Sequence, residues 1–209
     1  LSIASHQLRT PLGSMRWNLE LMESEIMSSP QGAQERLREV HKINLRVINL
    51  VRDLLNVTRI DQGRVEDEPE RTNVADIIQS AIKEIESQAH EKSVSVEMKI
   101  KRSDTPQLII DANRFREMVQ NLLTNAVRYT LPNGHVYVEI DYTDTSIEIV
   151  VSDTGIGIPK EDQPKIFSKF ARSENAAVID TEGSGLGLYI VKSYITGWGG
   201  KIWFESNVG

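Results

Sequence analysis

The sequence predicts a helical hairpin that becomes a four-helix bundle on dimerisation, followed by an α+β domain. In that second domain we expect a mixed, mainly antiparallel sheet packed on helices. Two patterns support this fold class: apolar residues recur every three or four positions in residues 1–63, and helical and strand-like segments then mix without strict alternation. The predicted domains are residues 1–63 and 72–209, joined by a linker at 64–71.

Two narrow apolar seams predict the hairpin. The first repeats about every 3.5 residues, as in a coiled coil, and consists of Leu8, Leu12, Met15, Leu19, Met22 and Ile26. Turn-forming residues at 28–32 interrupt it, and the second seam consists of Leu37, Val40, Ile43, Val47, Leu50, Leu54 and Val57. Because one hairpin cannot bury both seams by itself, we expect two chains to pair as a homodimer.

The second domain follows a polar, acidic linker that contains Pro69. Its first helix should be capped by Thr72 or Asn73, and Asp111 should cap a later helix that runs to about residue 128. Alternating apolar residues predict strands at 94–100, 136–140, 147–151 and 201–205, the middle two forming an antiparallel hairpin. A final helix is predicted at 186–196.

The composition argues against several classes of protein. A net charge of -6 over 209 residues is unlike a nucleic-acid-binding domain, which usually carries a basic patch. The lack of cysteine excludes a disulfide framework and a cysteine-based metal site. No apolar run is long enough to span a membrane. Since the chain begins inside a helical pattern, we interpret it as a cytoplasmic fragment that reaches a membrane only through upstream segments.

His6 is the first candidate for chemistry. On a helix it lies opposite the first apolar seam, and Thr10, four residues later, shares its outward face. An exposed neutral imidazole can act as a nucleophile. Pro11 removes one helical hydrogen bond nearby and should bend the helix, while Gln7 lies about 100° round the helix. Taken alone, this pattern more often describes an ordinary surface histidine.

A second candidate is the polar end of the helix that begins at Asp111. Asn121 and Asn125 lie one turn apart on the same face, and Arg128 follows within the next turn. Amide oxygens can bind Mg²⁺ when phosphates and waters complete the octahedron, and a guanidinium can bind phosphate. An ordinary polar helix end fits the same residues about equally well.

Two glycine-rich segments are further candidates. Asp153, Gly155 and Gly157 directly follow a predicted strand, where a carboxylate can accept a hydrogen bond from an exocyclic amine such as that of adenine. The segment 183–188 opens a helix and contains three alternating glycines, which favours phosphate binding by free N–H groups. Its spacing matches neither a P-loop nor a dinucleotide fingerprint. Each segment alone also fits a plain turn.

Residues 171–182 lie between these two glycine segments and show no apolar period. We interpret them as a lid over a bound ligand, hinged at Phe170 and Gly183. A plain surface loop is the alternative.

In this order and spacing, the motifs resemble the five conserved boxes of histidine kinases of two-component signalling. Residues 6–12 resemble the H-box, 121–130 the N-box, 153–157 the G1 box, 167–170 the F-box and 183–187 the G2 box. Each box alone is a weak match, whereas five in order over nearly the whole chain are specific. The chain is therefore identified as similar to a sensor histidine kinase.

The resemblance implies a role for each matching residue. His6 would be the phosphoacceptor, and Thr10 would serve the reverse reaction, hydrolysis of the partner's aspartyl phosphate. Mg²⁺ on the ATP triphosphate would be held by Asn125 and Asn121. The other nucleotide-binding residues would be Arg128, Tyr129, Asp153, Gly155, Gly157, Ile158, Phe170, Gly183, Gly185, Leu186 and Gly187. The implied partner is the receiver domain of a response regulator.

Two positions depart from the family pattern. Many members have an acidic residue after the phosphoacceptor, which is thought to accept its proton, and here that residue is Gln7, which cannot act as a base. Members also usually end with one more strand beyond position 207–209, so the sheet is expected to keep an open edge.

Other functions were weighed against this one. ATPases of the gyrase and chaperone type share the nucleotide pocket but use Glu where this chain has Asn121, and an amide cannot take a proton from water. A non-enzymatic binding module would retain the fold without the reaction. A bifunctional enzyme in which phosphatase activity dominates is compatible with Gln7.

Overall fold

The computed structural model describes residues 2–25, 29–64, 66–102, 106–143, 146–180 and 183–208. The chain divides into two compact units, Leu1–Arg64 and Val65–Gly209. Among the described residues, none of the helices combines the length and the apolarity that crossing a membrane would require.

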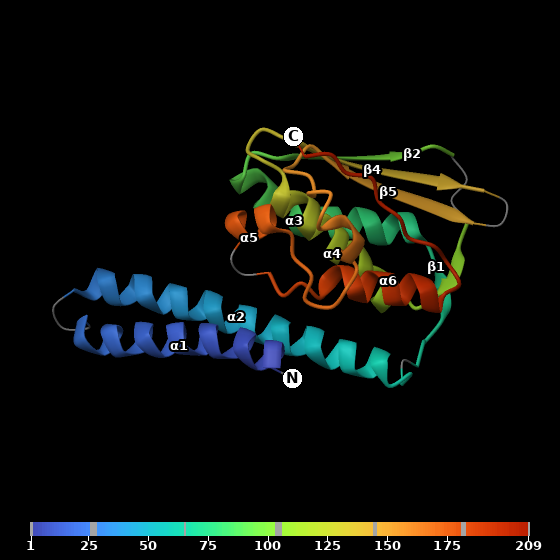
Figure 1. Cartoon of the computed structure of the whole chain (residues 1–209). Coiled ribbons are helices and arrows are strands. Elements are labelled where there is room, and N and C mark those ends of the chain that lie inside the picture. Colours follow the sequence, from blue (N-terminus) through green and yellow to red (C-terminus); the bar gives the residue numbers. More distant parts are fainter. Residues whose placement is uncertain are drawn as a thin grey trace. The chain divides into compact units, whose positions relative to one another are not determined.

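The first unit is an antiparallel pair of helices, α1 (Ser2–Glu25) and α2 (Pro30–Asp61) (Figure 1). The predicted hairpin is thereby confirmed. Helix α2 begins inside the predicted break, because proline is favoured in the first turn of a helix. The Ser29 side chain caps it by accepting a hydrogen bond from the Gly32 N–H at 3.3 Å. Ile26 and Ser28 lie outside the described residues.

The packing between α1 and α2 follows one predicted seam and departs from the other. On α2 the buried apolar residues include Ile43, Leu50 and Val57, as predicted, whereas Leu37 of the same seam is 54% exposed. On α1, however, Leu12 and Leu19 are 49% and 38% exposed, whereas Pro11 and Asn18 are buried. The face of α1 that packs inside the chain is therefore rotated by one residue from the predicted seam. Because the sequence predicts that one hairpin cannot bury both seams by itself, the exposure of Leu12 and Leu19 within one chain does not contradict the predicted bundle.

The second unit places helices against one face of a sheet (Figure 1). In chain order its elements are β1 (Glu70–Thr72), α3 (Val74–Glu91), β2 (Ser95–Ile100), β3 (Leu108–Ile110), α4 (Ala112–Tyr129), β4 (His135–Tyr142), β5 (Ile147–Asp153), a 3-10 turn (Gln163–Lys165), α5 (Glu174–Ile179) and α6 (Gly187–Gly197).

The sheet is mixed, as predicted. Strand β4 lies in its middle, parallel to β2 and antiparallel to β5, with Val138 opposite Val151. Strands β1 and β3 form a separate antiparallel pair. The core between the sheet and the helices α3, α4 and α6 includes the fully buried side chains of Ile78, Leu123, Ile140, Leu186 and Ile190.

One local prediction was wrong, and some short elements were not predicted. No strand forms at residues 201–205, although Ile202 and Phe204 are half-buried as the alternation suggested. Alternating apolar residues indicate which side chains are buried, but a strand also requires backbone hydrogen bonds to a neighbouring strand. The short strand β3 was not predicted, and neither was α5, which lies inside the stretch that showed no apolar period.

Part of the predicted linker is held firmly by the second unit. Arg114 near the start of α4 binds the Asp67 carboxylate and the Glu66 carbonyl. The Asp111 carboxylate accepts a hydrogen bond from the Glu68 N–H at 3.1 Å. Strand β1 then takes up the last two residues of the predicted 64–71 linker. Residues from Glu66 onward thus belong structurally to the second unit.

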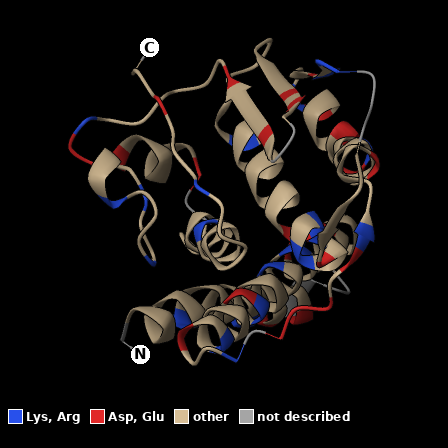
Figure 2. Ribbon diagram, turned by 90° about the vertical axis from the view of Figure 1, so that its right-hand side faces the viewer, with Lys and Arg blue, Asp and Glu red and all other residues tan. Residues whose placement is uncertain are grey.

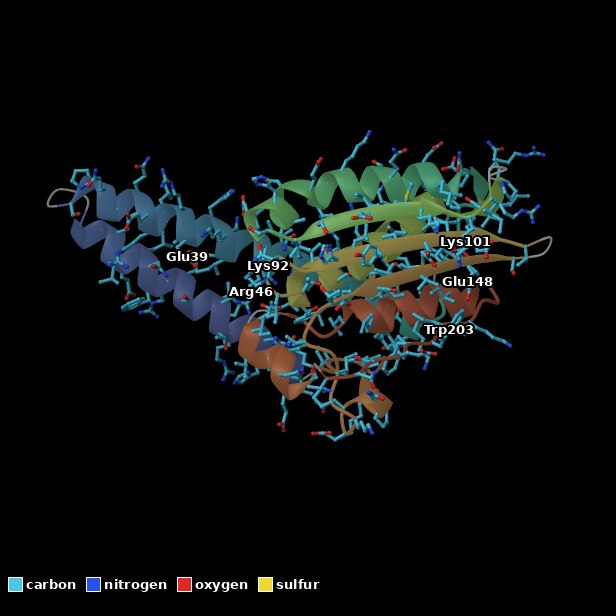
Figure 3. All side chains as sticks on the ribbon, turned by 90° about the horizontal axis from the view of Figure 1, so that it is seen from above. Glu39, Arg46, Lys92, Lys101, Glu148 and Trp203 are labelled. Atoms are coloured by element: carbon cyan, nitrogen blue, oxygen red, sulfur yellow. The ribbon has the colours of Figure 1, made fainter. Side chains whose placement is uncertain are left out.

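Charges of both signs are interspersed over the two units (Figure 2). On the exposed face of the sheet, for example, Lys101 pairs with Glu139 at 3.2 Å, close to Glu148 on β5 (Figure 3). Such exposed pairs contribute little to stability and mainly keep the surface soluble.

Candidate functional site

His6 lies on the exposed surface of α1, where the sequence predicted it. Thr10 is also exposed, and its hydroxyl lies 3.4 Å from the His6 carbonyl oxygen, to which it donates. Gln7 is half-buried and lies on a different side of the helix. The structure therefore brings His6 and Thr10 together on one accessible face and leaves Gln7 off that face.

The polar face of α4 carries the second group of predicted residues. Asp111 caps the helix by accepting from the Arg114 N–H at 3.0 Å, as predicted. Asn121, Asn125 and Arg128 are all half-buried, while the opposite side of the helix is packed into the core. The end of α4 thus presents two amides and a guanidinium in one row.

The N-terminus of α6 meets this row. A Cβ built on Gly187 would lie 2.9 Å from the Asn121 side-chain oxygen, so the absence of a side chain at Gly187 lets α6 approach Asn121 closely. Helix α6 has no side-chain cap, and its first N–H groups lack intrahelical partners. Leu186, immediately before the helix, is buried and anchors the segment. An amide oxygen and the N-terminal backbone N–H groups of α6 therefore converge at a point suited to a phosphate.

The loop after β5 is fastened to the end of α4. The Ile156 N–H donates to the Tyr129 carbonyl at 3.2 Å, and Gly155 forms an isolated bridge with Thr130. A Cβ on Gly155 would lie 2.5 Å from the same Tyr129 carbonyl oxygen. This close contact places Tyr129 beside the loop that carries Asp153.

Asp153 supplies the carboxyl group of the predicted nucleotide site, and its pKa is shifted. Burial raises its pKa from the ordinary value of 3.8, and a hydrogen bond from the Gly155 N–H, at 2.9 Å, lowers it by a smaller amount. The residue as a whole is nevertheless exposed to solvent. A partly desolvated carboxylate at a strand end is well suited to accept a hydrogen bond from a ligand amine.

The rest of this loop is held by segments distant in sequence. The Ile158 N–H donates to the Ser206 hydroxyl at 2.8 Å, and Gln163 bridges the carbonyls of both residues. Asn175 on α5 donates to the Gly157 carbonyl at 2.9 Å. Gly157 itself has φ +63°, a conformation that favours glycine.

Phe170 lies against the second glycine segment. Its backbone has φ +62°, and a Cβ on Gly185 would lie 2.7 Å from the Phe170 carbonyl carbon. We predicted a hinge at Phe170 and Gly183. Gly183, unlike Gly185, lies against Asp180: a Cβ built on Gly183 would lie 3.0 Å from the Asp180 carboxylate oxygen.

Sequence reasoning missed one basic residue behind the site. Lys92, just after α3, donates to the carbonyls of Val127 and Arg128, the former at 3.1 Å (Figure 3). Burial, and secondly the charge of Arg128, lower the pKa of Lys92. The ammonium group caps the C-terminus of α4 and fixes the turn that carries Arg128. No local signal could have revealed a contact between residues 35 positions apart.

The chemistry of a metal in this site is limited by the available ligands. Over the residues that the structure describes, no group of three or more His, Cys, Asp or Glu could hold a metal ion. Asn121 and Asn125 supply amide oxygens only, which fits an ion that takes most of its ligands from a nucleotide and water.

Known families match both units. Residues 110–209 match "Histidine kinase-, DNA gyrase B-, and HSP90-like ATPase", and residues 1–63 match "His Kinase A (phospho-acceptor) domain". The fold and site thus define a phosphoacceptor hairpin joined to an ATPase-type nucleotide domain.

Individual relatives are more specific. The signal transduction histidine-protein kinase/phosphatase MprB of Mycolicibacterium paratuberculosis is 36% identical over 98% of this chain and 39% of its own length. A solved mycobacterial sensor histidine kinase MprB is 30% identical, with a TM-score of 0.55 over 62% of this chain and 82% of that one. The chain belongs to the sensor histidine kinase family.

A further solved structure shares the fold alone. Histidine kinase ThkA, in complex with response regulator protein TrrA, has a TM-score of 0.61 at 21% identity, over 85% of this chain and 53% of that one.

Proposed function

We propose that this chain is the catalytic core of a sensor kinase that binds ATP with Mg²⁺ and phosphorylates its own His6. The phosphoryl group then passes to an aspartate of a response regulator. The observation that carries the proposal is the meeting of the Asn121 amide with the uncapped N-terminus of α6 at Gly187. That arrangement suits a triphosphate with a metal ion, whereas the exposed His6 supplies an acceptor.

Each group of residues has a distinct task in this proposal. Asp153 accepts a hydrogen bond from the adenine amine, and Tyr129 packs against the nucleotide. Arg128 and the first N–H groups of α6 bind phosphate. The amide oxygens of Asn125 and Asn121 hold the ion, which neutralises charge on the triphosphate when bound. The glycine segments and Ile158, Phe170 and Leu186 shape the pocket.

The reaction is an in-line transfer to an imidazole nitrogen of His6. A new P–N bond forms as the bond to ADP breaks, and the imidazole proton passes to solvent because the Gln7 amide cannot accept it. Phosphoryl transfer asks the protein mainly for positioning and charge stabilisation. The half-buried row on α4 provides positioning, and the exposure of His6 provides access.

Dimerisation through the hairpin is supported by a row of uncovered apolar side chains. Residues of α1 and α2 that are more than a third exposed include Leu12, Leu19, Leu37, Leu45, Ile48, Val51 and Leu55. Their spacing of three and four along α2 matches one face of a helix. Burying this face against a second copy gives the four-helix bundle that the sequence predicts.

Transfer to a response regulator, with the reverse phosphatase activity, completes the proposal. Support comes from the family: one relative is named a kinase/phosphatase, and one neighbour was solved in complex with a response regulator. The Thr10 hydroxyl lies on the same exposed face as His6, so the same docked partner can use both.

The test is incubation with γ-labelled ATP and Mg²⁺. The wild-type chain should acquire an acid-labile, base-stable label, whereas His6→Gln should remain unlabelled and still bind ATP within about twofold, since the pocket is in the other unit. His41 provides a matched control, because it is also an exposed histidine of the hairpin. His41→Gln should be labelled normally.

The possible outcomes separate the alternatives. Label at the wild-type level on His6→Gln would refute the phosphoacceptor assignment. Free phosphate without labelled protein would indicate an ATPase, and ATP binding with neither product would indicate a binding module.

A further inference from the structure

The guanidinium of the nucleotide site already has an anionic partner within the chain. Arg128 Nη1 donates to a carboxylate oxygen of Asp180 at 3.1 Å. Asp180 immediately follows α5, in the segment between the F-box and the G2 box. The carboxylate thus occupies a position on Arg128 that a phosphate oxygen would need.

A second arginine contacts the same residue. Arg172 donates from Nη2 to the Asp180 carbonyl, and this nitrogen also lies 4.0 Å from a carboxylate oxygen. The side chains of Asp180 and Arg172 are 14% and 19% exposed, so the pairing is largely shielded from solvent. Two guanidinium groups therefore share one carboxylate, and the three side chains carry one net positive charge.

The cluster lies against the glycine segment that opens α6. A Cβ on Gly183 would lie 3.0 Å from the Asp180 carboxylate and 3.4 Å from Arg172 Nε. Both glycine segments, the end of α4 and this carboxylate thus belong to one site. A carboxylate and a phosphate compete for the same guanidinium donors because both accept charge-assisted hydrogen bonds in a fork.

We propose that Asp180 is the intramolecular counter-ion of Arg128 and that a phosphate of the bound nucleotide displaces it. This inference rests on the proposed function. Asp180 stabilises the nucleotide-free site by pairing two arginines, and each binding event must first break that pairing. The apparent affinity for nucleotide is reduced by the fraction of molecules in which Arg128 is occupied. Asp180 is thus an affinity-determining residue that positions Arg128 and does not touch the reacting atoms.

The test is a double-mutant cycle with the full 209-residue chain. The dissociation constant of a non-hydrolysable ATP analogue with Mg²⁺ is measured by calorimetry for wild type, Asp180→Asn, Arg128→Met and the double variant. Asp180→Asn should bind about two- to fivefold more tightly, the range expected for releasing a partly screened ion pair. Arg128→Met should bind more weakly, and adding Asp180→Asn should then change nothing.

A second acidic residue provides the matched control. Asp162 accepts a hydrogen bond from the Glu174 N–H at 3.1 Å and so holds the other end of α5. Asp162→Asn should not tighten binding, because its carboxylate is not paired with Arg128. Higher salt should reduce the difference between wild type and Asp180→Asn.

Several results would overturn the proposal. Equal or weaker binding by Asp180→Asn would mean that the pair is only structural. The same gain in the Arg128→Met background would mean that Asp180 acts without Arg128. Labelling of His6 is measured separately. If wild type and Asp180→Asn bind nucleotide equally well and His6 is labelled, only the counter-ion role of Asp180 is refuted. If Asp180→Asn binds more tightly as expected but His6 is not labelled, only the kinase reaction is refuted. A wild-type chain that binds no nucleotide refutes both.

Discussion

Gly157 offers a quantitative test of how the loop after β5 is held. It has φ +63°, and a Cβ built on it would lie 2.0 Å from the Asn207 carbonyl oxygen. Real Cβ atoms keep at least 3.0 Å from such an atom, so Gly157→Ala requires the two backbones to move apart by about 1 Å. That movement should break the hydrogen bond between Ile158 and Ser206 and the bridge from Gln163.

The size of the effect follows from comparison with a second glycine. Gly199 has φ +76° but nothing within 4 Å of its ideal Cβ, so Gly199→Ala carries the conformational cost alone, about 1 kcal/mol. Gly157→Ala carries the same cost plus two lost hydrogen bonds at about 1 kcal/mol each. The expected destabilisation is therefore about 3 kcal/mol, roughly three times that of the control.

The assay is urea unfolding of both variants together with ATP binding. Gly157→Ala should also weaken ATP binding by at least about tenfold, because the displaced loop carries the predicted nucleotide contacts. Gly199→Ala should bind ATP normally. If both variants lose the same stability and both keep ATP affinity, the contact between the loop and the 206–207 segment does not hold the site.

Three further predictions concern function. Thr10→Ala should keep autophosphorylation and forward transfer but slow dephosphorylation of purified phosphorylated regulator in the presence of ADP; equal decay with both variants would exclude a role for the hydroxyl. Trp17, 60% exposed on α1, is a candidate anchor for the regulator, so Trp17→Ala should weaken transfer about tenfold. Loss of autophosphorylation together with a lower melting temperature would instead indicate a packing role. The raised pKa of Asp153 stabilises the fold below its unfolded pKa of 3.8, and that contribution is lost as pH rises through the folded pKa. Asp153→Asn should therefore stabilise the nucleotide-free chain at pH 7 in thermal unfolding while weakening ATP binding, and a variant less stable at pH 7 would contradict this.

The helices of the fold could be predicted well because their signals are local. Asp111 and Asn73 each cap a helix with their own side chains; the sequence identified Asp111 outright and Asn73 as one of two candidates, with Thr72. The apolar stripe of α2 also correctly predicted that Ile43 and Leu50 are buried in the hairpin. A cap and a stripe act within one or two turns, so they can be read without knowing the rest of the fold.

Where the prediction was wrong or incomplete, the structure depends on contacts between residues distant in sequence. Residues 201–205 alternate correctly, yet a strand depends on a partner elsewhere in the chain. Leu12 and Leu19 belong to a predicted seam and are exposed within one chain, because an apolar stripe does not reveal whether the same chain or a second copy covers it. The short helix α5 lacks an apolar stripe and is held by polar contacts, such as that of Asn175 with Gly157.

The candidate site combines both kinds of information. Its residue types and their order were visible in the sequence, because each box is a short local motif. The contacts that join those boxes into one site are between residues distant in sequence. Gly187 lies close to Asn121, Lys92 binds the backbone at the end of α4, and Asp180 pairs with the Arg128 guanidinium. A phosphate that enters this site meets a guanidinium already paired with a carboxylate of the chain. Binding is therefore an exchange of one anion for another, and substitutions that change this exchange should alter affinity without altering the fold.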